Sequence, residues 1–84
     1  MGNFDKLLFQ ILRGLSDNNF DFDDLCRLLS HLGFEQRIRG SHHIFRKSDV
    51  AELINLQKDG AKAKNYQVRQ VRNVIIKYRL SGGK

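Results

Sequence analysis

The stretch RIRGSHHIFRK, residues 37–47, decides the fold of this 84-residue chain. Gly40 and Ser41 separate two short runs whose neighbouring side chains would point to opposite sides of a strand. A glycine-serine pair between two such runs is typical of a turn. The stretch therefore predicts an antiparallel hairpin with strands over 34–39 and 42–47.

Helical patterns lie on both sides of this hairpin. Apolar residues recur at helical spacing over 3–15, 22–32 and 65–80. Asp21 is the expected N-cap of the second helix, because its side chain can accept a hydrogen bond from a free backbone N–H. Gly33 is the expected stop signal at the other end.

The remaining segments complete an α+β pattern. A third strand is expected over 52–57, a basic loop over 58–64, and Asn65 as the N-cap of the last helix. The order helix, helix, strand, strand, strand, helix predicts one domain, 1–84, with a three-stranded antiparallel sheet. Helices would cover one face of this sheet and leave the other face open.

Charge favours an anionic partner. The formal net charge is +6, and residues 34–84 hold twelve of the fifteen basic side chains against four acidic ones. Nucleic acid is therefore the first expectation, an acidic protein the second and a membrane surface the third. The run LLFQIL is too short to span a bilayer, so we expect a cytoplasmic protein without a membrane anchor.

Metal and thiol chemistry have little support in the sequence. The single cysteine, Cys26, falls in an apolar helical pattern and is expected to be a buried, inert thiol. His42 and His43 would point to opposite sides of one strand and could not chelate a metal together. No metal and no cofactor are therefore expected.

Strand alternation predicts two faces for the hairpin. With Ile38 and Ile44 in the core, the open side would carry an imidazole, two guanidinium groups, an ammonium group and an exposed ring. These are His43, Arg37, Arg39, Lys47 and Phe45. A shift of one residue would instead bury Phe45 and expose His42, Ile44 and Arg46.

The last helix and the loop before it add further cations. Arg69, Arg72 and Arg79 share one helical stripe, and Lys62 and Lys64 precede the helix. Basic residues at a helix start suit a phosphate backbone. A merely solvated helix face explains the stripe equally well.

Three motifs in this order resemble the HicA family of toxin–antitoxin toxins. They are LLSHLGF at 28–34, RGSHHIFRK at 39–47, and KNYQVRQV at 64–71. The resemblance covers roughly residues 21–80 and implies a double-stranded-RNA-binding-like fold. It also implies an mRNA endonuclease neutralised by a HicB-like antitoxin, with His43, the last residue of G-S-x-H, as the catalytic histidine.

A metal-independent route is expected for such an enzyme. His43 would act as general acid or base on the RNA's own 2′-OH, since histidine changes charge near neutral pH. The expected supporting residues are Gly40, Ser41, His42, Arg39 and Lys47. The expected RNA-binding residues are Arg37, Arg39, Phe45, Lys47, Lys62, Lys64, Arg69 and Arg72.

Two features depart from the family pattern. Lys64-Asn65-Tyr66 stands where the family has K-P-G, and residues 1–18 form an additional N-terminal helical extension. We expect this helix to pack beside the second one, while a homodimer or antitoxin contact is the alternative. Its apolar stripe is Phe4, Leu7, Leu8, Ile11, Leu12 and Leu15. Residues 81–84 are expected to be a flexible tail.

Two other functions fit the same sequence. A non-catalytic double-stranded-RNA or nucleic-acid-binding module explains the charge and the fold without using the histidine. A domain that binds an antitoxin but has no activity does so too. Replacement of His43 by alanine separates the enzyme from both alternatives, because only the enzyme would lose an activity.

Overall fold

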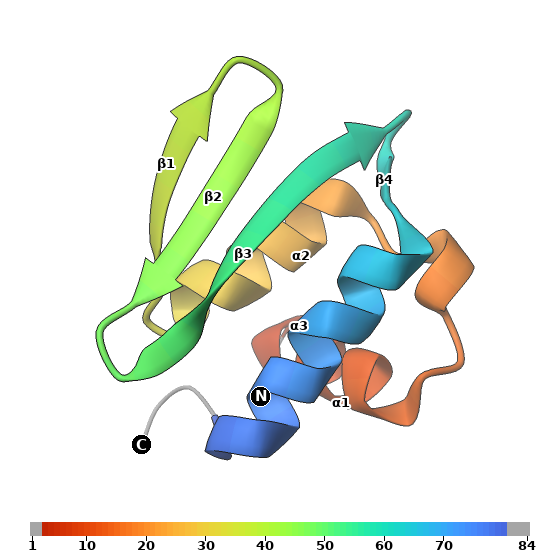
Figure 1. Ribbon diagram of the computed structural model, residues 1–84. Helices are drawn as coiled ribbons and strands as arrows, with labels where there is room; N and C mark the ends of the chain where they lie inside the picture. Colours follow the sequence, from red (N-terminus) through yellow and green to blue (C-terminus); the bar gives the residue numbers. More distant parts are fainter. Residues whose placement is uncertain (1–2, 81–84) are drawn as a thin grey trace.

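The hairpin forms as the sequence predicts and begins a four-stranded antiparallel sheet (Figure 1). The computed structural model describes residues 3–80; the tail expected over 81–84 lies outside the described residues. Strands β1 (Glu35–Arg39) and β2 (His42–Lys47) pair with Arg39 opposite His42. Gly40, at a φ of 59°, occupies the turn, where its lack of a Cβ avoids a steric penalty.

The third strand is longer than predicted, and a fourth follows it. Strand β3 spans Val50–Asp59, and a turn at Gly60 returns the chain into β4 (Lys62–Ala63). The expected loop over 58–64 is therefore largely strand and turn. The added strand is held by backbone hydrogen bonds, which need no alternating side-chain pattern and so leave no signal in the sequence. One of them runs from the Ala63 N–H to the Phe20 carbonyl at 2.9 Å.

Helices α2 (Phe22–His31) and α3 (Asn65–Tyr78) complete the double-stranded-RNA-binding-like order. The N-cap of α2 is confirmed, because the Asp24 N–H donates to Asp21 Oδ2 at 3.0 Å. The N-cap of α3 is Lys64, not the predicted Asn65. The Asn65 side chain instead donates to Asn18 Oδ1 at 2.8 Å.

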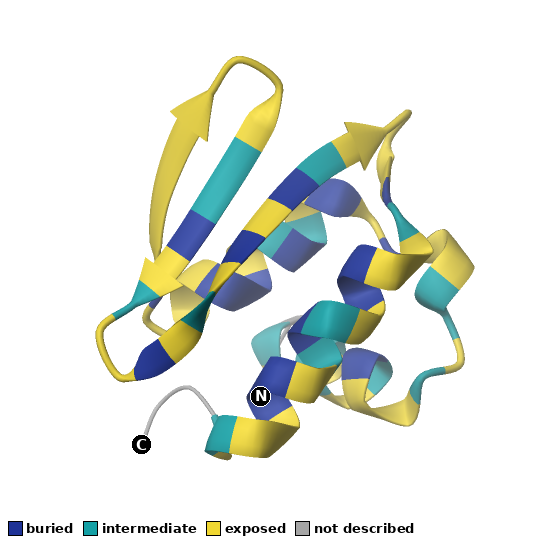
Figure 2. Cartoon of the chain, in the orientation of Figure 1, coloured by how far each residue is buried: buried dark blue, intermediate teal, exposed yellow. Residues whose placement is uncertain are grey.

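The core lies between one face of the sheet and the helices. Its fully buried side chains come from all three α-helices, from β2 and β3, and from the segment before α2 (Figure 2). The largest are Phe20, Phe22, Phe45, Ile11, Leu25, Leu28, Leu29, Ile54, Leu56, Val68 and Val71. Tyr78 closes the far end of this core, where its hydroxyl donates to Glu52 Oε1 at 2.8 Å.

The N-terminal extension packs on the core as expected. Helix α1 (Asn3–Arg13) lies against α2 and α3, and a single turn of 3₁₀-helix, η1 (Asp17–Asn19), links it to α2. Ile11 is fully buried, and Phe4, Leu7 and Leu8 pack partly buried against the core. Leu12 and Leu15, the last members of the stripe, are instead exposed.

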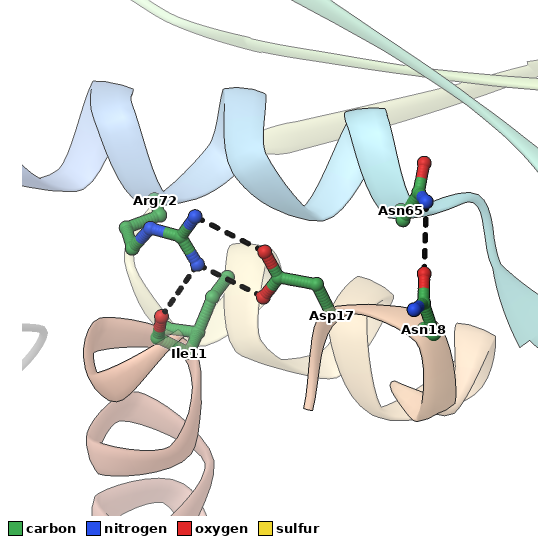
Figure 3. A network of polar contacts seen from close by, with 5 residues as sticks. All are labelled: Ile11, Asp17, Asn18, Asn65 and Arg72. Carbon is green, nitrogen blue, oxygen red and sulfur yellow. Dashed lines mark hydrogen bonds and ion pairs between the residues drawn. The ribbon is translucent and has the colours of Figure 1, made fainter. Parts of the chain in front are cut away.

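A polar network fastens this extension to α3 (Figure 3). Arg72 donates two hydrogen bonds to the Asp17 carboxylate, at 2.9 and 3.1 Å, and a third to the Ile11 carbonyl at 3.2 Å. The hydrogen bonds to Asp17 raise the pKa of Arg72 further above its ordinary value. Gly14, at a φ of 72°, lies so close to the guanidinium that a Cβ there would be 3.2 Å from Nη1.

Candidate active site

The register of the hairpin decides which histidine faces the helices. Phe45 is fully buried and pairs with Ile54, so His43, two residues earlier, also points toward the helices. The prediction that Ile44 is core and Phe45 exposed is wrong, and the alternative shifted by one residue is correct. The helices cover the side on which the larger Phe45 ring can be buried.

The predicted cluster of His43 with two arginines does not form. Arg37 lies opposite Ile44 and Arg39 lies opposite His42, so both guanidinium groups are on the open face of the sheet. Directly opposite residues of an antiparallel pair share a face, and His43 is on the other one. Ile38, opposite His43, is on the helix side but remains 58% exposed, because no helix covers the edge strand β1.

His43 is held from two directions on the helix side. Its Nδ1 lies 2.8 Å from Nε2 of Gln36, a residue of the neighbouring strand. Its ring meets the edge of the Phe22 ring, with a centroid separation of 4.9 Å and an interplanar angle of 78°. Lys58 Nζ lies 5.7 Å from the centre of the same Phe22 ring. The imidazole is half-buried, so one part of the ring is fixed and another is open to solvent.

The orientation of the Gln36 amide is coupled to the position of the proton on the His43 ring. As placed, the amide nitrogen donates to Nδ1, which leaves the proton of a neutral ring on Nε2. Rotation of the amide by half a turn would present its oxygen, which accepts from an Nδ1–H and frees the Nε2 lone pair. One side chain can therefore support a ring that donates at Nε2 or one that accepts there.

The other predicted site residues are distributed over both faces. His42 Nδ1 lies 3.1 Å from Asn55 Oδ1 on the open face, and the Ser41 hydroxyl accepts from Gln57 at 3.3 Å beside the turn. Lys47 shares the His43 side but pairs with Asp49 at 2.9 Å, and this hydrogen bond lowers the Asp49 pKa. Lys47 is also about 13 Å along the strand from His43.

The cationic side chains near α3 differ in whether they already have a charged partner. The Arg72 side chain is only 17% exposed and is paired with Asp17, so it is not available to RNA. Phe45, another predicted RNA-binding residue, is buried and cannot stack on a base. Arg69 is exposed, Lys62 donates to the neutral Asn19 amide at 2.8 Å, and Lys64 precedes α3.

Sequence reasoning missed two residues beside His43. A turn of Gly40 and Ser41 alone pairs Ile38 with His43 and so brings Gln36 within diagonal reach of the imidazole. This register could have been read from the sequence. Lys58 could have been found only by extending β3 past its predicted end, because Lys58 follows Leu56 on the same face.

The described residues form no cluster suited to a metal ion, and their one thiol has a raised pKa. Across 3–80, no group of three or more His, Cys, Asp or Glu side chains could hold a metal ion. Burial raises the pKa of the Cys26 thiol to about 11, and Asp23 adds to the effect. None of the helices in this part of the chain is long and apolar enough to cross a membrane.

Fold and surface together define a class of protein: a small, basic α+β domain of the double-stranded-RNA-binding type with a histidine held at the helix side of its sheet. The family described as HicA toxin of bacterial toxin–antitoxin systems matches residues 22–77, two thirds of the chain. The chain therefore belongs to the HicA toxin family. Searches of curated proteins and of solved structures give no match.

Proposed function

We propose that this HicA-family toxin is a metal-independent endoribonuclease that cleaves mRNA through His43. The observation that carries the proposal is the environment of this imidazole. Gln36 contacts its Nδ1 and Phe22 packs against the ring, while the residue is only half-buried. A histidine with one nitrogen oriented and the ring accessible can transfer a proton in a defined geometry.

RNA supplies the nucleophile in this mechanism. With the Gln36 amide rotated so that its oxygen accepts from Nδ1–H, His43 Nε2 removes the proton from a 2′-OH. The 2′ oxygen bonds to the adjacent phosphorus, and the bond from phosphorus to the 5′ oxygen breaks. A proton from water completes the leaving 5′-OH, and a 2′,3′-cyclic phosphate remains on the other fragment. His42 takes no direct part, because it lies on the opposite face of the sheet.

The developing charge on phosphate needs a nearby cation. Lys58 serves this role better than the predicted Arg39 or Lys47, since it is exposed beside Phe22, which itself contacts His43. Arg39 faces the other side of the sheet, and the Lys47 charge is already paired. A cation in this position stabilises the transition state electrostatically.

The RNA backbone would continue over Lys62, Lys64 and Arg69. Lys62 has a neutral hydrogen-bond partner, so its charge is free to attract phosphate. Each phosphate contact releases counterions and contributes a salt dependence of about −0.7 to −0.9 in log–log slope. Replacing the three residues by alanine should flatten the slope of RNA binding by about two, and an unchanged slope would place the RNA elsewhere.

The family membership also bears on the partner. HicA toxins act in toxin–antitoxin systems, so we propose a HicB-like antitoxin as the protein partner and the cytoplasm, where mRNA is found, as the site of action. Copurification of this chain with the product of a neighbouring reading frame would test the pairing. A chain that remains free beside such a product would contradict it.

The adjacent histidines provide the matched test of catalysis. The wild-type chain should cleave RNA in the presence of a chelator, and a substrate with 2′-deoxy sugars should remain intact. The variant His43→Ala should lose cleavage while retaining RNA binding, and His42→Ala should keep both. Loss of cleavage in both variants, or cleavage by His43→Ala, would refute the role of His43. Binding without any cleavage by the wild type would favour the non-catalytic module.

A further inference from the structure

Strand β1 is an edge of the sheet that offers its backbone to another chain. Within residues 3–80 it pairs with β2 on one side and with no strand on the other. All five of its residues are exposed, and Figure 2 shows the strand exposed along its whole length. The unpaired backbone N–H and C=O groups of such an edge can bind an added strand.

The open face beside this edge has an excess of positive charge, with three arginines against Glu35, which lies opposite Arg46. Arg37, Arg39 and Arg46 are exposed, and none of their side chains makes a hydrogen bond or ion pair with another described residue. Glu35 is the one acidic side chain of β1. Free guanidinium groups favour carboxylates, which they can bind through two parallel hydrogen bonds.

The other side of the same strand is apolar. Ile38 is 58% exposed and lies on the helix side, opposite His43. Side chains of a strand added to β1 would alternate between the two sides. Alternate positions would therefore meet Arg37 and Arg39, and the positions between them would meet Ile38.

We propose that β1 docks an extended segment of a partner protein in which acidic and apolar residues alternate. The segment adds to the sheet as a fifth strand, with carboxylates on the two arginines and an apolar side chain on Ile38. Its residues then lie beside Gln36, whose amide contacts His43, and the relevance of this contact to catalysis rests on the proposed function. A partner docked here would lie one strand away from the imidazole proposed as catalytic.

Two other occupants fit less well. A second copy of β1 paired antiparallel about its centre would place Arg37 opposite Arg37, and like charges directly opposite are destabilising. RNA cannot form a backbone ladder with a strand. It would also find no phenyl ring to stack on, since Phe45 is buried.

A labelled nine-residue peptide of alternating glutamate and valine tests the proposal. It should bind the wild-type chain, measured by fluorescence anisotropy, and slow amide hydrogen exchange in β1. A peptide with lysine in place of glutamate should bind at least about tenfold more weakly. So should a glutamate peptide with alternate backbone nitrogens methylated, because the methyl groups block the ladder but keep the charges.

Paired charge reversals locate the site. Arg37→Glu with Arg39→Glu should abolish binding of the glutamate peptide and favour the lysine peptide. The control, Arg13→Glu with Arg27→Glu, makes the same change in net charge on the helices and should leave binding unchanged. None of these readouts measures cleavage, so an inactive enzyme and a failed docking site are distinguishable.

Four results would overturn the proposal. They are equal binding of the methylated peptide, unchanged exchange in β1, equal loss of binding in the control variant, and protection of β1 by single-stranded RNA instead of the peptide. A peptide-free dimer that protects β1, detected by sedimentation, would show that a second copy is the occupant.

Discussion

Replacement of Arg72 by glutamine removes the cation that joins three segments of the chain. Its guanidinium contacts Asp17 in η1 and the Ile11 carbonyl in α1 while its backbone lies in α3 (Figure 3). Glutamine is too short to bridge the same atoms. The Asp17 carboxylate, 16% exposed, would then keep its charge in a partly desolvated position without its partner.

The cost follows from the geometry of the pair. Exposed ion pairs contribute about 0.2–1 kcal/mol, whereas breaking a buried pair costs about 3–5 kcal/mol. With side-chain exposures of 17% and 16% and two hydrogen bonds between charged groups, this pair lies between these cases. We expect the free energy of unfolding to fall by about 2–3 kcal/mol. For a domain of this size that corresponds to a Tm lower by roughly 10–20 °C.

A second arginine–aspartate pair supplies the control. Arg27 pairs with Asp24 at 3.2 Å, with side-chain exposures of 67% and 38%, so Arg27→Gln should cost about 0.5 kcal/mol or less. Urea unfolding followed by circular dichroism measures both variants, and a double-mutant cycle with Asp17→Asn isolates the pair. Equal stability of Arg72→Gln and Arg27→Gln would refute the reasoning. So would a coupling energy near zero between Arg72 and Asp17.

Three further predictions concern stability and reactivity. Gly14→Ala should lower the Tm more than Gly60→Ala, because both glycines have positive φ but only at Gly14 would a Cβ press on the Arg72 guanidinium; equal losses in thermal melts would contradict this. Cys26 should react with iodoacetamide at pH 8 about a hundredfold more slowly than a thiol at the ordinary pKa of 9.0, since its pKa is raised to about 11; a normal alkylation rate would show that the thiol is not perturbed. Removal of residues 1–18 should lower the Tm markedly and promote aggregation, because it uncovers the surface on which Ile11 is buried; a stable truncated monomer in sedimentation would contradict it.

The sequence by itself determined the three main helices, the first three strands and their order, but not β4 or η1. The turn at Gly40, the capping carboxylate of Asp21 and the apolar spacing of α3 act within a few residues of the chain, so they can be read locally. The resemblance to the HicA family pointed to His43 as the candidate catalytic residue, because it is the last residue of the G-S-x-H motif. The helix boundaries differ by a few residues, because backbone partners such as the Ile75 and Ile76 carbonyls at the end of α3 have no sequence signal.

Tertiary structure decided which face each of these residues occupies. Alternation fixes only that neighbours point apart, and the choice of the buried side came from packing Phe45 beneath the helices. That choice placed Arg37 and Arg39 away from His43 and brought Gln36 to its Nδ1. The pairing of Arg72 with Asp17, 55 residues away, likewise depends on how α1 and η1 pack on α3. Contacts between distant segments form only when the whole core assembles, and local patterns therefore cannot specify them.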